Sequence, residues 1–146
     1  MRVLFVCLGN TARSQMAAAL YNKLAHTHDA DSAGTAVQKP GQTLLERKRE
    51  LPDRAFTIDV MDEIGIDVRN NKSTQLTQEM LDKYDLVVSM VTEQYAPDWL
   101  IHAPNYLYWD VDDPKGISYE LTAKARDIIR HKVEVLISSE TPVRAS

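Results

Sequence analysis

A short segment near the start of the chain combines a nucleophile with groups that suit an anion. Its residues are, in order, Cys7, Leu8, Gly9, Asn10, Thr11, Ala12, Arg13 and Ser14. Gly9 can adopt backbone conformations closed to other residues and lets a ligand approach closely, and the N–H groups of such a loop can form an anion-binding nest. Arg13 lies six residues after Cys7. A loop curled around an anion therefore returns the guanidinium over the thiol, where it can hold an oxyanion through two parallel hydrogen bonds. We predict that residues 8–14 bind an oxyanion substrate beside Cys7.

The chemistry expected of this loop is nucleophilic. Positive surroundings favour the thiolate form of Cys7, which can attack phosphorus or an analogous centre. Ser14 can donate a hydrogen bond to the thiolate, and Asn10 can fix the loop by tolerating a left-handed conformation. The alternatives are a buried structural cysteine and a phosphate-binding loop without catalysis. The segment lacks the Gly-Lys-Ser/Thr ending of a nucleotide P-loop, which argues against a kinase or a GTPase.

A second segment could supply a proton. Cleavage of a phosphomonoester requires one for the leaving oxygen, and Asp113 is a candidate donor on a loop. Pro114 restricts the backbone of Asp113 to extended conformations, which limits how the carboxyl group is presented. The residues from 112 to 116 are equally typical of an ordinary turn. From these residues alone both interpretations stay open.

The elements that must position these residues alternate between strands and helices. Residues 3–6 are fully apolar and predict a strand buried on both faces. After a tight loop, Met16, Ala19, Leu20 and Leu24 recur at helical spacing. A weak second strand is expected near residues 28–32, with a turn-like stretch at 31–35. Residues 41–55 are polar and charged, and a solvated helix face or a surface loop is expected there rather than a binding patch. Whether residues 40–57 form a lid or an idle insertion stays open.

The second half of the chain continues the alternation. A short helix over residues 58–64 is expected to end at Gly65, followed by strands at 85–90 and 106–109. Residues 117–138 predict a long helix, and residues 140–146 a frayed tail. Its expected apolar face consists of Leu121, Ala125, Ile128, Ile129, Val133 and Leu136. This order favours a parallel α/β sheet with helices on both faces. Cys7 follows the first strand and Asp113 the last, so connectivity places both at the edge where such sheets bind ligands.

Composition narrows the function classes. The 146 residues are about the size of one domain, and we expect a single domain over residues 1–146. The formal charge is −4, which gives no overall basic field for nucleic acid. No apolar run is long enough for a membrane span or a signal peptide. The one cysteine excludes an intramolecular disulfide and makes a zinc cluster improbable, so no metal is expected and a reducing cytoplasm is the simplest compartment.

Several stretches together resemble one family. They are residues 3–10, the Cys-x5-Arg-Ser loop at 7–14, Ser32 to Thr35, residues 85–90 and the Asp113-Pro114 pair. Along nearly its whole length the chain resembles the low-molecular-weight protein tyrosine phosphatase superfamily, which also contains thiol-dependent arsenate reductases. The resemblance implies a four-stranded parallel sheet flanked by helices and a phosphocysteine intermediate. It also implies Cys7 as nucleophile, Arg13 as oxyanion ligand, Asp113 as general acid, and a supporting position near the loop for Ser32. No metal or organic cofactor is implied.

The chain departs from both branches of that superfamily. Typical phosphatases carry a second cysteine where this chain has Ala12, proline where it has Gln15, and aromatic residues where Lys115 and Gly116 follow Asp-Pro. Residues 13–17 and 109–114 look more like arsenate reductases, whose thioredoxin-coupled members use two further cysteines. With one cysteine, a reductase needs an external thiol and a redoxin, whereas hydrolysis needs only water. We therefore expect a phosphatase acting on a phosphate, phosphoprotein or other oxyanion substrate. A single-cysteine arsenate reductase is the alternative, and a non-catalytic oxyanion-binding module a further one.

Overall fold

Four parallel strands form the centre of the molecule, and the structure, a computed structural model, describes residues 1–140. The strands are β1 (Val3–Cys7), β2 (Ala30–Gly34), β3 (Leu86–Ser89) and β4 (Tyr106–Tyr108). Their order across the sheet is β2-β1-β3-β4, with every neighbouring pair parallel. All five residues of β1 are buried, as expected for an apolar strand between two neighbours and between two layers of helix. The four-stranded parallel sheet is as predicted.

Helical segments connect the strands. They are α1 (Arg13–Ala25), α2 (Leu44–Glu50), α3 (Thr57–Glu63), α4 (Asp98–Ile101) and α5 (Tyr119–Glu140), with the short 3₁₀ turns η1 (Gln78–Lys83) and η2 (Glu93–Tyr95). A capping box begins α2, because Thr43 accepts from the Glu46 backbone N–H while the Glu46 side chain accepts from the Thr43 N–H. Gly65, with a φ of 76°, follows the end of α3 as predicted.

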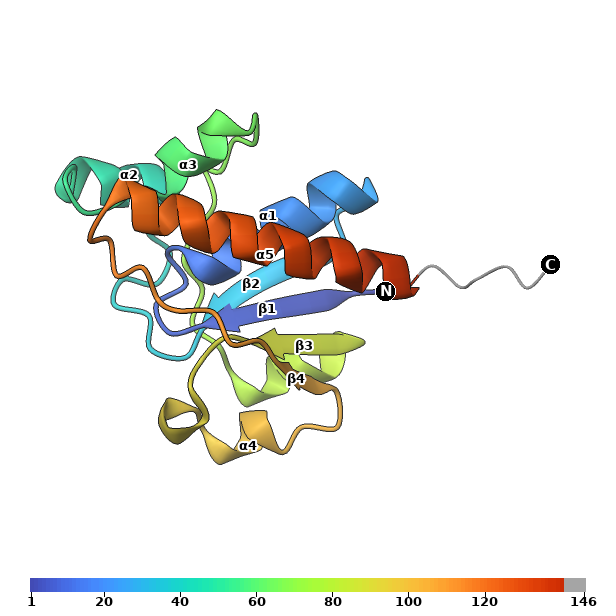
Figure 1. Cartoon of the computed structure of the whole chain (residues 1–146). Coiled ribbons are helices and arrows are strands. Elements are labelled where there is room, and N and C mark those ends of the chain that lie inside the picture. The colour runs from blue at the N-terminus through green and yellow to red at the C-terminus, as the bar shows by residue number, and fades with distance from the viewer. Residues whose placement is uncertain (141–146) are drawn as a thin grey trace.

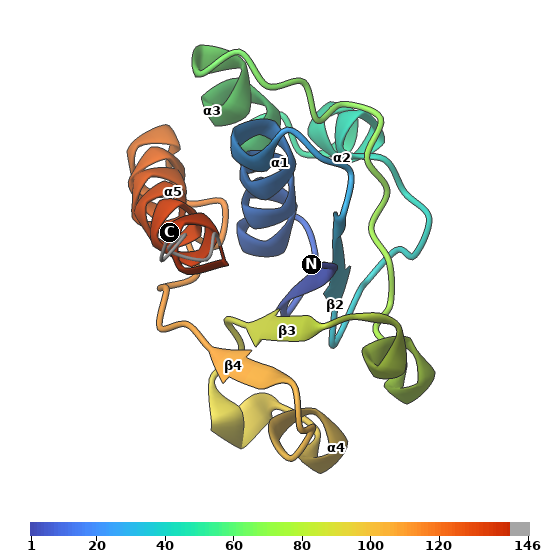
Figure 2. The same cartoon turned by 90° about the vertical axis from the view of Figure 1, so that its right-hand side faces the viewer.

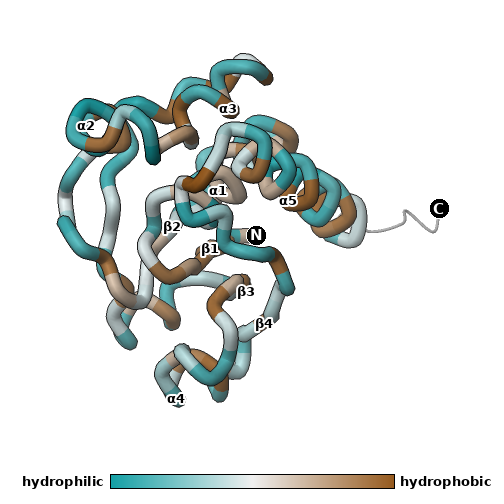
Figure 3. The backbone as a smooth tube through the Cα atoms, turned by 60° about the vertical axis from the view of Figure 1, so that its left-hand side comes forward, coloured by the Kyte–Doolittle hydropathy of each residue, from teal (hydrophilic) through white to brown (hydrophobic). Residues whose placement is uncertain are grey.

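The two faces of the sheet carry separate cores. Val3 and Phe5 of β1 face α1, α3 and α5, and pack against Met16, Leu20, Met61, Ile129 and Val133. Leu4 and Val6 face the other side, where Leu81 of η1 and Leu100 of α4 cover them. Figures 1 and 2 show α1 and α5 on one side of the strands and α4 on the other. In Figure 3 the tube is hydrophobic through β1 and largely hydrophilic along α2. The molecule is a single domain with helices on both faces of the sheet.

The strand register determines which residues meet at the functional edge. Cys7, the last residue of β1, pairs with Gly34, the last residue of β2. On the other side Val6 pairs with Ser89, the last residue of β3. The carboxyl ends of three strands therefore lie together, and the loop after Cys7 leaves the sheet at its centre, where ligands bind in folds of this kind.

Some expectations about the elements were wrong in detail. The second strand spans Ala30–Gly34 rather than residues 28–32, and its small residues pair fully with β1. On α5, Leu121 and Ile128 are 45% and 39% exposed. The buried stripe instead consists of Thr122, Ala125, Arg126, Ile129 and Val133. A 3.6-residue period turns Leu121 and Ile128 roughly 100° from the centre of that stripe. Of the predicted frayed tail, Glu140 ends α5, and residues 141–146 lie outside the described part of the chain.

Candidate active site

The sulfur of Cys7 lies inside a hydrogen-bonded loop. The Asn10 backbone N–H donates to Cys7 Sγ at 3.3 Å, and Ser14 Oγ lies 2.9 Å from the same sulfur. The Asn10 side-chain amide donates to Ser14 Oγ at 2.7 Å. Because Ser14 Oγ accepts from Asn10, its own proton is available for the sulfur. Both interactions then place donors on sulfur, an arrangement that stabilises a thiolate.

Asn10 is the structural centre of the loop. It is fully buried, and its φ of 55° is the left-handed conformation expected from the sequence. Its side-chain oxygen accepts from the Thr74 N–H at 2.8 Å, and its backbone oxygen accepts from Ser73 Oγ at 3.1 Å and Gln15 Nε2 at 3.2 Å. The conformation that aims the Asn10 N–H at the sulfur is therefore held from three directions.

Two further contacts fix the outside of the loop. Thr57 Oγ donates to the Thr11 carbonyl at 2.7 Å and thereby joins the loop to the start of α3. Gly34 lies so close that a Cβ there would stand 2.8 Å from the Leu8 carbonyl oxygen and 2.9 Å from the Asn10 nitrogen. Only a residue without a side chain fits between β2 and the loop.

Arg13, the first residue of α1, is buried and oriented by backbone carbonyls. Its Nη1 donates to the Met90 oxygen at 2.6 Å and to the Val111 oxygen at 2.9 Å. These bonds use one end of the guanidinium and leave the edge formed by Nε and Nη2, the pair of parallel donors that suits an oxyanion. The carbonyls follow β3 and β4, so the sheet itself positions the arginine.

Asp113 stands at the mouth of the same site. Its carboxylate lies 3.7 Å from Arg13 Nη2, and the aspartate side chain is 34% exposed while that of Arg13 is 8% exposed. The Lys115 backbone N–H donates to Asp113 Oδ1 at 2.9 Å, which is the turn expected of an Asp-Pro sequence. The two sequence interpretations of this segment are therefore compatible, because the turn holds the carboxylate beside Arg13.

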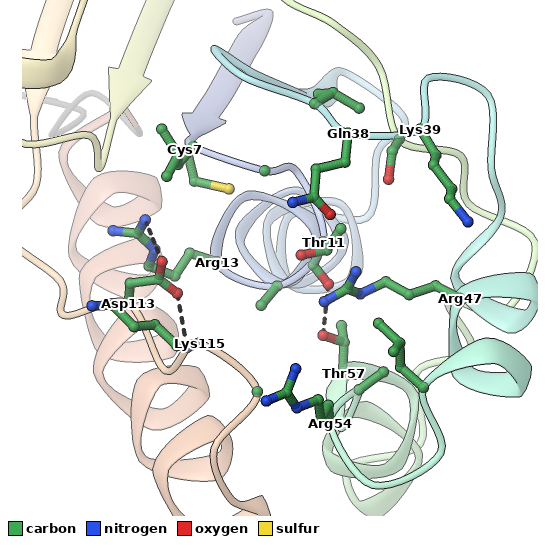
Figure 4. A pocket seen from close by; sticks show the side chains of 18 of the residues that line it. Cys7, Thr11, Arg13, Gln38, Lys39, Arg47, Arg54, Thr57, Asp113 and Lys115 are labelled. Atoms are coloured by element: carbon green, nitrogen blue, oxygen red, sulfur yellow. Dashed lines mark hydrogen bonds and ion pairs between the residues drawn. The ribbon is translucent and has the colours of Figure 1, made fainter.

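A pocket of about 420 Å³ opens above the sulfur. Its walls come from the Cys7 loop, residues 36–42, α2 with the turn that follows it, and the Asp113 loop. Figure 4 shows Arg13 and Asp113 on one side of Cys7, with Arg47 and Arg54 extending into the same space from the opposite wall. Phe56 is the single aromatic residue among those that line it. The lining therefore combines apolar side chains with many charged ones and includes one aromatic ring.

Most predicted site residues meet in this pocket. Cys7, Leu8, Gly9, Thr11, Ala12, Arg13 and Asp113 line it, and Asn10 and Ser14 support it from below. Two details differ from the prediction. The φ of Gly9 is not positive, so of the two loop residues expected to take unusual backbone conformations only Asn10 does so. Ser32 pairs with Phe5 within the sheet, and within residues 1–140 no hydrogen bond joins its side chain to the loop.

Sequence reasoning missed the residues that reach the site from elsewhere. Ser73 supplies the serine contact expected of Ser32, and Thr57 holds the loop from α3. Residues 41–55 were expected to be solvated, yet Arg47 and Arg54 line the pocket. The one signal was the basic run at 46–50, which local pattern alone assigns to a solvated surface.

Two features of residues 1–140 bear on other classes of function. Within residues 1–140, no three side chains among His, Cys, Asp and Glu are grouped so as to hold a metal ion. Over the same part of the chain, no helix combines the length and apolar character needed to cross a membrane.

The chain is similar to known proteins in sequence. The family model described as low molecular weight phosphotyrosine protein phosphatase matches residues 2–143. The glutaredoxin arsenate reductase of Synechocystis sp. is 31% identical over 139 residues, which cover 94% of this chain and 96% of that protein. Sequence similarity thus extends over nearly the whole length of both chains.

Solved structures of similar fold include both kinds of enzyme. A low molecular weight protein tyrosine phosphatase from T. tengcongensis matches with a TM-score of 0.74 at 27% identity, covering 95% of this chain and 99% of that one. An arsenate reductase in a phosphate-binding state has the same TM-score and identity, covering 95% and 98%. The arginine phosphatase YwlE, as a mutant with a phosphorylated active-site serine, matches at 0.78 and 26% identity, covering 99% and 98%. The chain belongs to the low molecular weight phosphotyrosine protein phosphatase family.

Proposed function

We propose that the protein is a cysteine-based phosphomonoester hydrolase. The observation that carries this proposal is the position of the Cys7 sulfur, between the Ser14 hydroxyl and the Asn10 N–H, in a pocket that also holds the Arg13–Asp113 pair. Nucleophile, oxyanion ligand and proton donor then occur together, which argues against a non-catalytic binding module.

In the proposed first step, the Cys7 thiolate attacks the phosphorus of the substrate. The Nε and Nη2 edge of Arg13 and the N–H groups of the loop stabilise the charge on the phosphoryl oxygens. The S–P bond forms as the P–O bond to the leaving group breaks, and protonated Asp113 gives its proton to the departing oxygen. The product is a phosphocysteine. The phosphorylated active-site serine of the YwlE mutant is in keeping with such a covalent intermediate.

In the second step, water attacks the same phosphorus while Asp113 takes one of its protons. The S–P bond breaks, and the Ser14 hydroxyl stabilises the departing thiolate. The cycle returns to its starting state with the protein's own groups and water, so it needs neither a metal nor an organic cofactor. Phosphate or a related oxyanion is the ligand expected in the loop, and an arsenate reductase of similar fold is known in a phosphate-binding state.

Arsenate reduction is the second candidate, supported by the names of the sequence relatives. The chain has one cysteine, so it cannot form a disulfide with itself. An external thiol would have to supply the second sulfur. Two electrons from the two sulfurs would reduce arsenic(V) to arsenic(III), leaving a mixed disulfide on Cys7 for a redoxin to reduce. Hydrolysis is preferred because it completes its cycle without these additions.

A phosphoarginine substrate, suggested by the YwlE neighbours, is less well supported. Five cationic side chains line the pocket, namely Arg13, Lys39, Arg47, Arg54 and Lys115, against two carboxylates, Glu50 and Asp113. A leaving group that carries a guanidinium would meet repulsion there. An oxygen-linked phosphate avoids that repulsion.

Side-by-side assays distinguish the two main candidates. The purified protein should hydrolyse p-nitrophenyl phosphate, and Cys7→Ser should abolish this turnover because a serine hydroxyl is a far weaker nucleophile. The same preparation is tested for arsenate reduction with glutathione or mycothiol and a redoxin. Hydrolysis that survives Cys7→Ser, or reduction without hydrolysis, would contradict the proposed function.

A further inference from the structure

Four cationic side chains that lie outside the Cys7 loop surround the opening of the pocket. We call Lys39, Arg47, Arg54 and Lys115 the cationic rim. They come from separate parts of the chain: the segment after β2, α2, the turn before α3, and the loop after β4. Such convergence on one opening is not the consequence of a single basic run in the sequence.

The carboxylates of the pocket neutralise only part of this charge. Glu50 pairs with Lys39 at 2.7 Å, and Asp113 faces Arg13 at 3.7 Å. Within residues 1–140, no ion pair closer than 4 Å is formed by Arg47, Arg54 or Lys115. Three positive charges of the rim are thus unpaired where a substrate would enter.

Arg47 is the most informative of the three. It is half-buried against the pocket, and burial lowers the pKa of its guanidinium, while the negative charge of Glu50 acts in the opposite direction. A partly desolvated cation is costly unless an anion lies near it. Figure 4 shows the Arg47 guanidinium reaching toward Thr11 and Thr57, deep in the same space as the sulfur. A negatively charged ligand group would compensate that cost.

The segment that carries Arg54 of the rim also contacts the backbone of the Asp113 loop. A Cβ at Gly116 would lie in severe overlap with the Arg54 carbonyl oxygen, so the Asp113 loop and the turn that carries Arg54 are in direct contact. Phe56 is the one aromatic side chain in the lining. The lining therefore presents several cationic side chains and one aromatic ring.

From these contacts we infer that the cationic rim selects phosphorylated protein segments in which acidic residues flank the phosphorylated side chain. This inference rests on the proposed function and specifies its substrate class. Binding of the phosphoryl group itself requires only the Cys7 loop and Arg13. The unpaired charges of Arg47, Arg54 and Lys115 are left for carboxylates elsewhere on the substrate, where complementary charge favours both encounter and discrimination.

The test compares two phosphotyrosine peptides, one flanked by two glutamates on each side and one by two glutamines. Wild-type protein should have a higher kcat/KM for the acidic peptide, and this advantage should shrink as salt is added. In the double variant Arg47→Gln/Arg54→Gln, the ratio of the two kcat/KM values should fall roughly tenfold. Arg49→Gln is the matched control on α2, because Arg49 is exposed and outside the pocket lining; it should leave the ratio unchanged.

Measurements of peptide binding test this inference separately from the proposed function. The Kd of both peptides is measured with the Cys7→Ser variant, with and without the Arg47→Gln/Arg54→Gln changes, so that the rim is assessed even if no peptide is hydrolysed. Tighter binding of the acidic peptide that depends on Arg47 and Arg54 supports the rim. Equal affinity for both peptides, or a preference that Arg49→Gln removes equally, overturns it. Hydrolysis of p-nitrophenyl phosphate decides the proposed function independently.

Discussion

At the sulfur, the direction of each hydrogen bond matters for chemistry. The chain from Thr74 through Asn10 to Ser14 and Cys7 runs in one sense, with each group accepting from the one before it. The last donor in that chain is the Ser14 hydroxyl. It is therefore suited to stabilise negative charge on sulfur, which in the proposed mechanism exists both before attack and when sulfur departs from phosphorus.

Replacing Ser14 with alanine should slow turnover by roughly 10- to 100-fold, because a hydrogen bond to a charged group contributes about 1.5–3 kcal/mol. The loss should be largest in hydrolysis of the phosphocysteine, where the thiolate is the leaving group. Rapid-quench measurement of the intermediate tests this, and Ser139→Ala, on the exposed end of α5, is the control. Unchanged breakdown of the intermediate would show that Ser14 has only a packing role.

Replacing Asp113 with asparagine removes the proposed proton donor and keeps the shape of the side chain. Phosphoryl transfer should slow strongly for alkyl phosphates, whose leaving groups are poor, and much less for p-nitrophenyl phosphate. The measurement is the dependence of kcat/KM on leaving-group pKa for both proteins. Equal slowing across the series would indicate that Asp113 acts through its ion pair with Arg13 alone.

Local sequence was sufficient to predict which residues lie closest to the Cys7 sulfur. Cys7, Asn10, Arg13 and Ser14 lie within one turn and the start of a helix, so their spacing already limits their geometry. The supporting contacts of Thr57 and Ser73 could not be predicted, because each spans more than forty residues along the chain. Such pairings depend on tertiary packing. The family resemblance suggests Ser32 as the supporting serine, whereas the serine that contacts the loop is Ser73.

At the scale of elements, the site depends on how closely β2 approaches the Cys7 loop. Gly34 ends β2 opposite Cys7, and its N–H and carbonyl bond to Thr74 and Leu76. The strand thereby joins the segment that holds Asn10 to the sheet. A side chain at this position would push that segment and the loop apart.

The Gly34→Ala variant should lose at least tenfold in activity and about 1–3 kcal/mol in the free energy of unfolding, as overpacked sites do. Its Cβ would meet Leu8, Asn10 and Val37 atoms at 2.8–2.9 Å. Gly41→Ala is the matched control: its φ of 87° adds backbone strain, but no atom lies within 4 Å of the new Cβ. Steady-state kinetics and urea unfolding of both variants test this, and equal activity in the two would contradict it.

Element existence could be predicted better than element boundaries. The apolar run of β1 and the spacing of α1 identify both elements without tertiary information. β2 could not be placed well, because its sequence, Ala-Asp-Ser-Ala-Gly, has little intrinsic strand preference and becomes a strand by pairing with β1. On α5 the apolar pattern was broader than the contact surface, so Leu121 and Ile128 were assigned to the core although solvent reaches them.

For the molecule as a whole, the ionisation of partly buried tyrosines should lower the free energy of unfolding at alkaline pH. Burial, followed by a hydrogen bond to Asp31, raises the pKa of Tyr84 to about 12. Burial and the charge of Glu93 raise that of Tyr106 to about 12. Since an unfolded tyrosine ionises near pH 10, the stability that these side chains contribute is complete below about pH 10 and is lost as pH rises toward 12.

The free energy of unfolding should therefore fall between about pH 10 and about pH 12, and fall less steeply in Tyr84→Phe. Urea titrations at a series of pH values measure the slope. Tyr95→Phe, at a residue that is 70% exposed, should keep the wild-type slope. Identical slopes in all three proteins would exclude Tyr84 as a contributor.

The contact between Gly116 and the Arg54 carbonyl has a consequence for how this protein can diverge. The segment that carries Asp113, the proposed proton donor, and the segment that carries Arg54 of the cationic rim touch through backbone atoms, so neither can be remodelled independently. Inserting a residue into either segment would displace the acid and the recognition surface together. New substrate preferences are therefore more accessible through exchange of the side chains at positions 47, 54 and 115 than through changes in loop length.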